Sequence, residues 1–188
     1  MAISNDNYVI QGLSGTVGKL LTFRQRGQKT VVQKYRRTTN IPPTEKLKSV
    51  RASFASCIAY AKTVVKNPAV KAIYQAAAKD GQTAFNVATS DALNPPELTS
   101  INTSGYLGLP GDTIEIQATD DFKVAEVVVS IHGPTGELLE QGNAVQDPNT
   151  GDWLFKATKE NSKLTGSTIT ASAKDLPGNN GSLSVIMY

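Results

Sequence analysis

The chain has 188 residues and a mass of 20.0 kDa, so it is long enough for one large domain or two small ones and too short for a large multidomain enzyme. Hydrophobic residues make up 39% and charged residues 19% of the sequence, which is typical of globular proteins and not of disordered or membrane-spanning ones. One cysteine, Cys57, excludes an intramolecular disulfide, and one histidine, His132, leaves the usual metal and general-base sites without their residues. We therefore expect neither catalysis nor a bound cofactor.

The net charge of +3 hides an asymmetry between the two halves of the chain. Residues 1–95 hold 14 Lys and Arg against 4 Asp and Glu, a net charge of +10, whereas residues 96–188 hold 5 against 12, a net charge of −7. The sign changes at Pro95-Pro96, where helices and strands tend to stop. We predict a basic domain over 1–95 and a second domain over 96–188.

The first predicted element is a β-hairpin with strands at 16–25 and 29–36. Its loop contains Gly27, which supplies the positive φ that short hairpin loops need. Gly12, Gly15 and Gly18 precede the hairpin without the spacing of a phosphate loop, so we expect them to permit bends in the backbone. Four apolar side chains are expected to point away from the polar face: Leu21, Phe23, Val31 and Tyr35.

Basic residues are concentrated in this hairpin, and the run from Asn7 to Thr44 contains no acidic residue. Closely spaced Lys and Arg side chains bind phosphates through counterion release, so a nucleic-acid-binding β-ribbon is one interpretation. The alternatives are a solvated hairpin whose charges oppose edge pairing, and docking on an acidic protein surface. The candidate binding residues are Lys19, Arg24, Arg26, Lys29, Lys34, Arg36 and Arg37.

Three helices are predicted after Pro42-Pro43. Thr44 is the expected N-cap of the first, Asn67-Pro68 starts a second that ends at Asp80-Gly81, and a third covers about 82–91. Apolar residues recur in the first helix at spacings of three and four, which indicates one inward stripe. The stripe consists of Leu47, Val50, Phe54, Ile58, Ala61 and Val65.

The order of motifs in this half is Gly12-Leu-Ser-Gly-Thr-Val-Gly18, the basic hairpin, Pro42-Pro43-Thr44, the first helix with Arg51 and Phe54, and Gly81-Gln-Thr-Ala-Phe-Asn86. With its motifs in this order, the N-terminal half resembles a group of uncharacterised bacterial proteins found in phage-like or mobile-element neighbourhoods. The resemblance covers about half the chain and implies a context without assigning functional residues. Components of phage-like particles often join a small assembly domain to an immunoglobulin-like one, so the resemblance implies a role in assembly.

The C-terminal half is predicted to be all β, which makes the chain α+β overall. Short runs of Val, Ile and Thr are separated by Gly, Pro, Asn and Asp, and alternate residues are apolar. The seven predicted strands are 98–103, 112–118, 123–132, 137–143, 152–157, 167–174 and 181–187. Seven strands in about 90 residues are typical of an immunoglobulin-like or fibronectin III-like sandwich.

Three stretches of this half resemble bacterial immunoglobulin-like repeats: 118–121, 151–153 and 171–179. The antibody subtype is not expected, because the half has no cysteine pair and Trp153 falls on the fifth strand. In such a sandwich the loops after the second, fourth and sixth strands share the end that faces the first domain. That end would gather Asp120, Asp121 and Asp175, whose oxygens suit Ca²⁺; alternatively, these acids face basic residues of the first domain.

We expect a non-catalytic assembly or protein-interaction protein that forms homo-oligomers. Residues 1–8 have neither the basic nor the apolar region of a secretory signal, so the expected place is the cytoplasm or a phage-like particle. The first alternative is a nucleic-acid-binding protein that uses the basic hairpin. The second is a carbohydrate-binding or surface adhesin module, which the sandwich favours and the lack of a signal disfavours. No membrane and no small-molecule substrate is expected.

Overall fold

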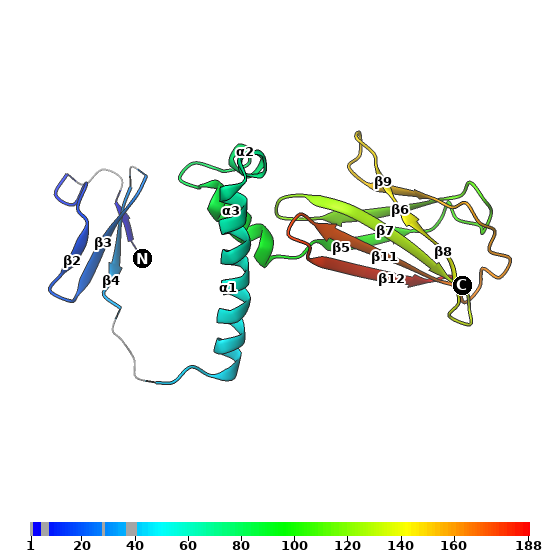
Figure 1. Ribbon diagram of the computed structural model, residues 1–188, viewed down its shortest axis with the longest axis horizontal. Helices are drawn as coiled ribbons and strands as arrows, with labels where there is room; N and C mark the ends of the chain where they lie inside the picture. Colours follow the sequence, from blue (N-terminus) through cyan, green and yellow to red (C-terminus); the bar gives the residue numbers. More distant parts are fainter. Residues whose placement is uncertain (1, 5–7, 28, 37–40) are drawn as a thin grey trace.

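The computed structural model describes residues 2–4, 8–27, 29–36 and 41–188. The fold is α+β: a small N-terminal sheet is followed by three helices and then by two antiparallel sheets (Figure 1). Figure 1 places the N-terminal sheet at one end of the long axis and the two C-terminal sheets at the other. Within the described ranges, no helix combines the length and the apolarity needed to cross a bilayer.

The N-terminal sheet is antiparallel, with the strand order β1-β4-β3-β2. Its strands are β1 (Ala2–Ser4), β2 (Gly15–Val17), β3 (Leu21–Arg26) and β4 (Lys29–Lys34). The predicted hairpin is present as β3 and β4, and Gly27 has the expected positive φ of 61°.

The predicted strand 16–25 is interrupted, which the sequence pattern did not indicate. Gly18 and Lys19 have φ values of 57° and 53°, and the Leu20 N–H donates to the Val17 carbonyl at 3.0 Å. Two successive positive φ values reverse the chain inside the three-residue connection 18–20, so β2 folds back on β3 with Val17 opposite Leu21. Strand β1, which was not predicted, adds an edge beside β4.

The three predicted helices are confirmed as α1 (Glu45–Lys66), α2 (Pro68–Ala76) and α3 (Ala84–Leu93). Thr44 caps α1 as predicted, because its hydroxyl accepts from the Leu47 N–H at 3.3 Å. Asn67 caps α2, with its side-chain oxygen 3.1 Å from the Ala69 nitrogen. Helix α2 ends at Ala76, four residues before the predicted end.

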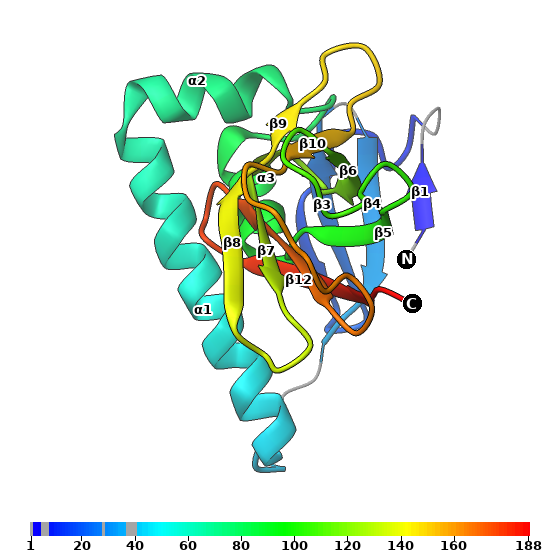
Figure 2. The same cartoon turned by 90° about the vertical axis from the view of Figure 1, so that its right-hand side faces the viewer.

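The inward stripe predicted for α1 is wrong for the first half of that helix and for Val65, which is 38% exposed. Leu47, Val50 and Phe54 are 41%, 56% and 48% exposed. The buried positions of α1 are Cys57, Ala61 and Val64, which lie in its second half. Helices α2 and α3 pack only against that second half, so the first half of α1 extends beyond them (Figures 1 and 2). The pattern identified an apolar face but not how much of it the chain covers.

All seven strands predicted for the C-terminal half are present, together with one short additional strand, β9. The strands are β5 (Glu97–Asn102), β6 (Thr113–Thr119), β7 (Val124–His132), β8 (Leu138–Asn143), β9 (Val145–Gln146), β10 (Trp153–Lys156), β11 (Thr168–Asp175) and β12 (Asn180–Ile186). They form two antiparallel four-stranded sheets, ordered β5-β6-β10-β9 and β12-β11-β7-β8. Alternate residues of both sheets meet in one hydrophobic core that includes Ile114, Val129, Phe155 and Ile169.

Helices α1, α2 and α3 pack together and meet the end of the two C-terminal sheets at a junction. The Phe122 ring, from the loop between β6 and β7, stacks on Tyr74 of α2 with 4.5 Å between ring centroids. Asn179, from the loop between β11 and β12, donates its side-chain N–H to the Ala92 carbonyl at 3.2 Å. Apolar packing and hydrogen bonds therefore hold this junction.

The predicted pairing of acids in the second half with cations in the first is not found. Among the residues that the structure describes, the one ion pair joins Lys48 to Glu45 within α1. Most of the excess positive charge lies in the part of the chain that forms the N-terminal sheet, which lies at the opposite end of the molecule from the acidic C-terminal sheets (Figure 1). Within the described ranges, the opposite charges of the two halves are thus not neutralised by ion pairs between the halves.

Candidate functional site

One face of the N-terminal sheet is apolar and largely uncovered. Register places Val17 opposite Leu21 and Phe23 opposite Val32, so these four side chains share a face, which we call the apolar face. Val17 is 62% and Leu21 43% exposed, while Phe23 and Val32 are half-buried. No helix or C-terminal strand packs extensively against this sheet in the part of the chain described here.

The predicted membership of this face is wrong for Val31. Val31 pairs with Arg24 and therefore lies on the opposite face from Leu21. The predicted three-residue loop would have paired residue 23 with residue 31, but the observed loop has two residues because Arg26 pairs with Lys29. A change of one residue in a hairpin register moves every side chain of a strand to the other face.

The opposite face carries three of the predicted binding residues. Arg24, Arg26 and Lys29 share it, all three are exposed, and we call them the basic face. The other candidates are not brought together with them: Lys19 lies in the β2–β3 turn, Lys34 shares the apolar side of the sheet, and Arg36 follows β4. Arg37 lies outside the described residues. No described residue forms an ion pair with the basic face.

This sheet has almost no core of its own. Over residues 8–27 and 29–36, the buried residues are Thr30 and Val31. Thr30 is held by polar contacts, since its hydroxyl accepts from the Gly12 N–H at 3.2 Å and from the Gln25 side-chain N–H at 3.0 Å. Small sheets gain independent stability from a covered hydrophobic face, which this one lacks.

A second candidate site lies at the junction of the helices with the C-terminal sheets. Asp91 of α3, Asp120 after β6 and Asp175 at the end of β11 each direct a carboxylate toward the same point, and we call them the carboxylate cluster. One oxygen from each lies within 4.8 Å of the other two. Asp91 is 0% and Asp175 2% exposed, while Asp120 is half-buried.

Hydrogen bonds fix each member of the carboxylate cluster. The Asp175 Oδ1 atom accepts from the backbone N–H groups of Gly178 and Asn179 at 2.7 and 2.6 Å. The Asp120 Oδ2 atom accepts from a backbone N–H at 3.1 Å. The Asp91 Oδ2 atom accepts from the Tyr74 hydroxyl. The Oδ1 atoms of Asp91 and Asp120 are buried and have no hydrogen-bond partner among the described residues.

Burial dominates the electrostatics of this cluster. It raises the pKa of Asp91 from 3.8 to about 7; the Tyr74 hydroxyl opposes the rise, and repulsion from Asp120 and Asp175 adds to it. Burial also raises the pKa of Tyr74 far above its ordinary range, with the Asp91 carboxylate contributing. The pKa of Tyr60, whose hydroxyl lies 2.8 Å from that of Tyr74, is raised chiefly by burial.

Sequence reasoning identified two members of this cluster. Asp120 and Asp175 come together at the predicted end, but Asp121 is exposed and accepts instead from the Asn94 side chain at 2.5 Å. The third member, Asp91, was missed because it belongs to the other half of the chain. The available signal was an acidic residue on the inward face of an otherwise uncharged helix.

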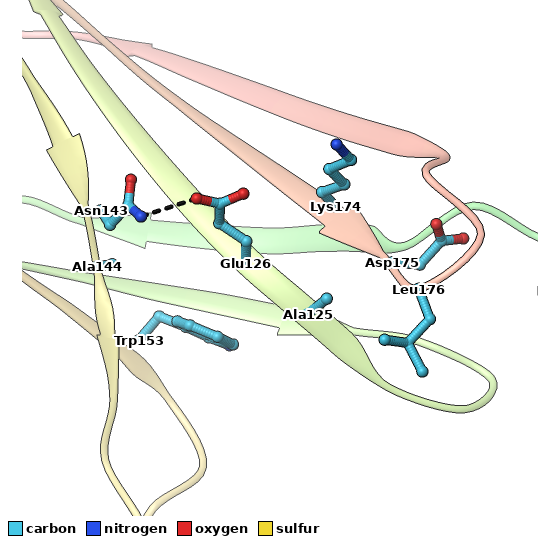
Figure 3. A pocket seen from close by; sticks show the side chains of 8 residues that line it. All are labelled: Ala125, Glu126, Asn143, Ala144, Trp153, Lys174, Asp175 and Leu176. Atoms are coloured by element: carbon cyan, nitrogen blue, oxygen red, sulfur yellow. Dashed lines mark hydrogen bonds between the residues drawn. The ribbon is translucent and has the colours of Figure 1, made fainter. Parts of the chain in front are cut away.

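A pocket of about 450 Å³ lies beside the cluster, between β7, β10 and β11 (Figure 3). Its lining includes Trp153 and Lys174, and the Asn143 side chain donates to Glu126 at 2.7 Å. Asp175 belongs both to the lining of this pocket and to the carboxylate cluster, although Figure 3 shows its carboxylate turned away from Trp153.

Comparison of the chain with protein-family models, with curated proteins and with solved structures finds no match.

Proposed function

We propose that the protein is a non-catalytic assembly protein that associates with further copies of itself through its N-terminal sheet. The observation that carries this proposal is the uncovered apolar face formed by Val17, Leu21, Phe23 and Val32. A contiguous exposed apolar surface marks an interaction site, and a sheet with only Thr30 and Val31 buried needs further contacts to be stable.

Helix α1 offers a second surface of the same kind. Leu47, Val50 and Phe54 recur at helical spacing on the part of α1 that α2 and α3 do not cover. An exposed apolar stripe on a helix is suited to packing against a sheet or another helix. This stripe and the apolar face are therefore the two surfaces that we expect an oligomer to bury.

Charge favours a second copy of this chain as the partner. The basic residues of the N-terminal sheet have no acidic partner within the described chain, and residues 96–188 carry a net charge of −7. The two charged parts lie at opposite ends of the molecule (Figure 1). Contact between unlike ends of successive copies would pair these charges, and such head-to-tail contacts build rings or filaments.

We further infer that the C-terminal sheets form an immunoglobulin-like sandwich that displays its loops. The inference is supported by the strand order, in which the first, second and fifth long strands share one sheet and the third, fourth, sixth and seventh share the other. The shared core, which includes Ile116, Val127 and Phe155, gives the display module stability of its own.

A pair of substitutions in the full chain tests the assembly proposal. Leu21→Asp places a charge on the apolar face, whereas Thr22→Asp places the same charge on the opposite face one residue later. We expect light scattering to give an oligomer for the original chain and Thr22→Asp, and a smaller species for Leu21→Asp. Equal masses for the two variants would contradict a role for the apolar face.

The basic face supports a second candidate function, nucleic-acid binding. Arg24, Arg26 and Lys29 are exposed on one face of a β-ribbon, an arrangement that contacts successive phosphates. Three phosphate contacts predict a slope of about −3 for the logarithm of the binding constant against that of the salt concentration. Changing all three to Gln should abolish this slope. The matched control changes three exposed helical lysines: Lys62, Lys66 and Lys71.

A further inference from the structure

We propose that the carboxylate cluster binds one divalent cation of the calcium class and thereby ties α3 to the C-terminal sheets. Asp91 comes from the helical part of the chain, while Asp120 and Asp175 come from two loops of the sheets. A shared cation would join segments that are 29 or more residues apart in the sequence. This proposal is independent of the assembly proposed above.

The size of the cluster fits a calcium ion. Carboxylate oxygens lie about 2.3–2.6 Å from Ca²⁺, so two of them on opposite sides of the ion are about 4.6–5.2 Å apart. One oxygen each of Asp91, Asp120 and Asp175 lies within 4.8 Å of the others. We assign the ion to Ca²⁺ because Ca²⁺ accepts several carboxylates in a flexible geometry, whereas Mg²⁺ demands near-octahedral geometry and usually keeps several of its waters.

Unpartnered buried oxygens are the second observation that points to a ligand. Asp91 is fully buried, yet its Oδ1 atom has no hydrogen-bond partner among the residues described. The Oδ1 atom of Asp120 is buried and unpartnered as well. Buried carboxylate oxygens are nearly always satisfied, and a cation placed between Asp91 and Asp120 would satisfy both.

Among the described residues, no Lys or Arg forms an ion pair with the cluster. Its contacts are the Tyr74 hydroxyl, the Asn179 side chain and backbone N–H groups, all of them neutral. Lys79 lines a pocket of about 270 Å³ that reaches Asp91, but it forms no ion pair there. A bound Ca²⁺ would supply the missing positive charge.

Calcium titration of the full chain by calorimetry tests the proposal. The protein is first treated with a chelator and then exchanged into chelator-free buffer, and CaCl₂ is added from about 10 μM to about 10 mM, the range of weak to moderate protein sites. Asp120→Asn removes one ligand charge, while Asp121→Asn makes the same change at the adjacent residue outside the cluster. Circular dichroism shows whether each variant is folded.

We expect one Ca²⁺ per chain, equal affinity for the original protein and Asp121→Asn, and at least about 10-fold weaker binding for Asp120→Asn. Absence of saturable Ca²⁺ binding would overturn the proposal and leave protonation of Asp91 as the way the cluster is neutralised. Unchanged affinity in folded Asp120→Asn would also overturn it. Tighter binding of Mg²⁺ than of Ca²⁺ would overturn the assignment of the ion.

Terbium luminescence provides a readout that does not depend on heats of binding. Tb³⁺ replaces Ca²⁺ at oxygen-rich sites and emits when a nearby tyrosine transfers energy to it. The Tyr74 hydroxyl is hydrogen-bonded to Asp91, so Tb³⁺ in the cluster would lie close to that ring. We expect emission that Ca²⁺ displaces and that Asp120→Asn lacks; emission equal in Asp120→Asn and Asp121→Asn would place the ion elsewhere.

Discussion

Replacement of Asp91 by Asn is expected to stabilise the metal-free protein at alkaline pH. In the fold the pKa of Asp91 is raised from 3.8 to about 7, so between these values the native state holds a proton that the unfolded chain has lost. The free energy of unfolding contributed by this group therefore falls as pH rises from about 4 to about 7 and is constant above. Asn in this place carries no charge, and its N–H group can donate to the unpartnered Asp120 oxygen.

The magnitude follows from the pKa. Between pH 5 and pH 7 Asp91 is ionised in the unfolded chain but protonated in the native state. The free energy of unfolding therefore falls by about 1.4 kcal/mol per pH unit, or about 3 kcal/mol in total. The titratable groups that face Asp91 are Asp120, Asp175 and the Tyr74 hydroxyl, and the tyrosine stays protonated throughout this range. The advantage of Asp91→Asn over the original chain should grow by about 3 kcal/mol between pH 5 and pH 8.

Urea unfolding in the presence of a chelator, followed by circular dichroism at pH 5 and pH 8, measures this difference. Asp121→Asn is the control, because it removes an exposed carboxylate one residue from the cluster and should show no comparable gain. If Asp91→Asn changed stability by the same amount at both pH values, the reasoning about a buried, protonated Asp91 would be refuted.

Two further substitutions probe contacts that hold the C-terminal sheets. Gly181→Ala should lower the free energy of unfolding by about 1–3 kcal/mol, because a Cβ there would lie 2.0 Å from the Pro96 carbonyl oxygen. The control, Ser182→Ala at the exposed neighbouring position, should have little effect, and thermal unfolding measures both. Glu140→Ala should cost about 2–3 kcal/mol in urea unfolding, since the buried Glu140 carboxylate accepts from the Thr158 N–H and hydroxyl at 2.8 and 2.5 Å. An unchanged midpoint would mean that water replaces these bonds.

The elements of the fold were predictable because local signals agreed with the tertiary structure. Alternation in residues 113–118 and 127–131 marked strands with one buried face, and Thr44 and Asn67 marked helix starts by side-chain capping. Each of these signals depends on a few neighbouring residues, and the folded chain has the strand or helix start that the signal indicated.

Features set by longer-range geometry were not predictable in the same way. The face of Val31 depended on whether the hairpin loop has two or three residues, which the sequence around Gly27 did not decide. The exposure of Phe54 depended on the reach of α2 and α3, not on the pattern of α1 itself. Asp91 joins the carboxylate cluster only because α3 packs against the end of the C-terminal sheets.

Light scattering from the unmodified full chain, over a range of concentrations at about 0.1 and about 0.5 M salt, tests self-association most directly. We predict a mass above the 20.0 kDa of one chain at both salt concentrations, because salt does not screen apolar contacts on the N-terminal sheet. Larger species are expected at low salt, where the basic end of one copy attracts the acidic end of another. A mass of 20.0 kDa at every concentration and both salts would contradict the account.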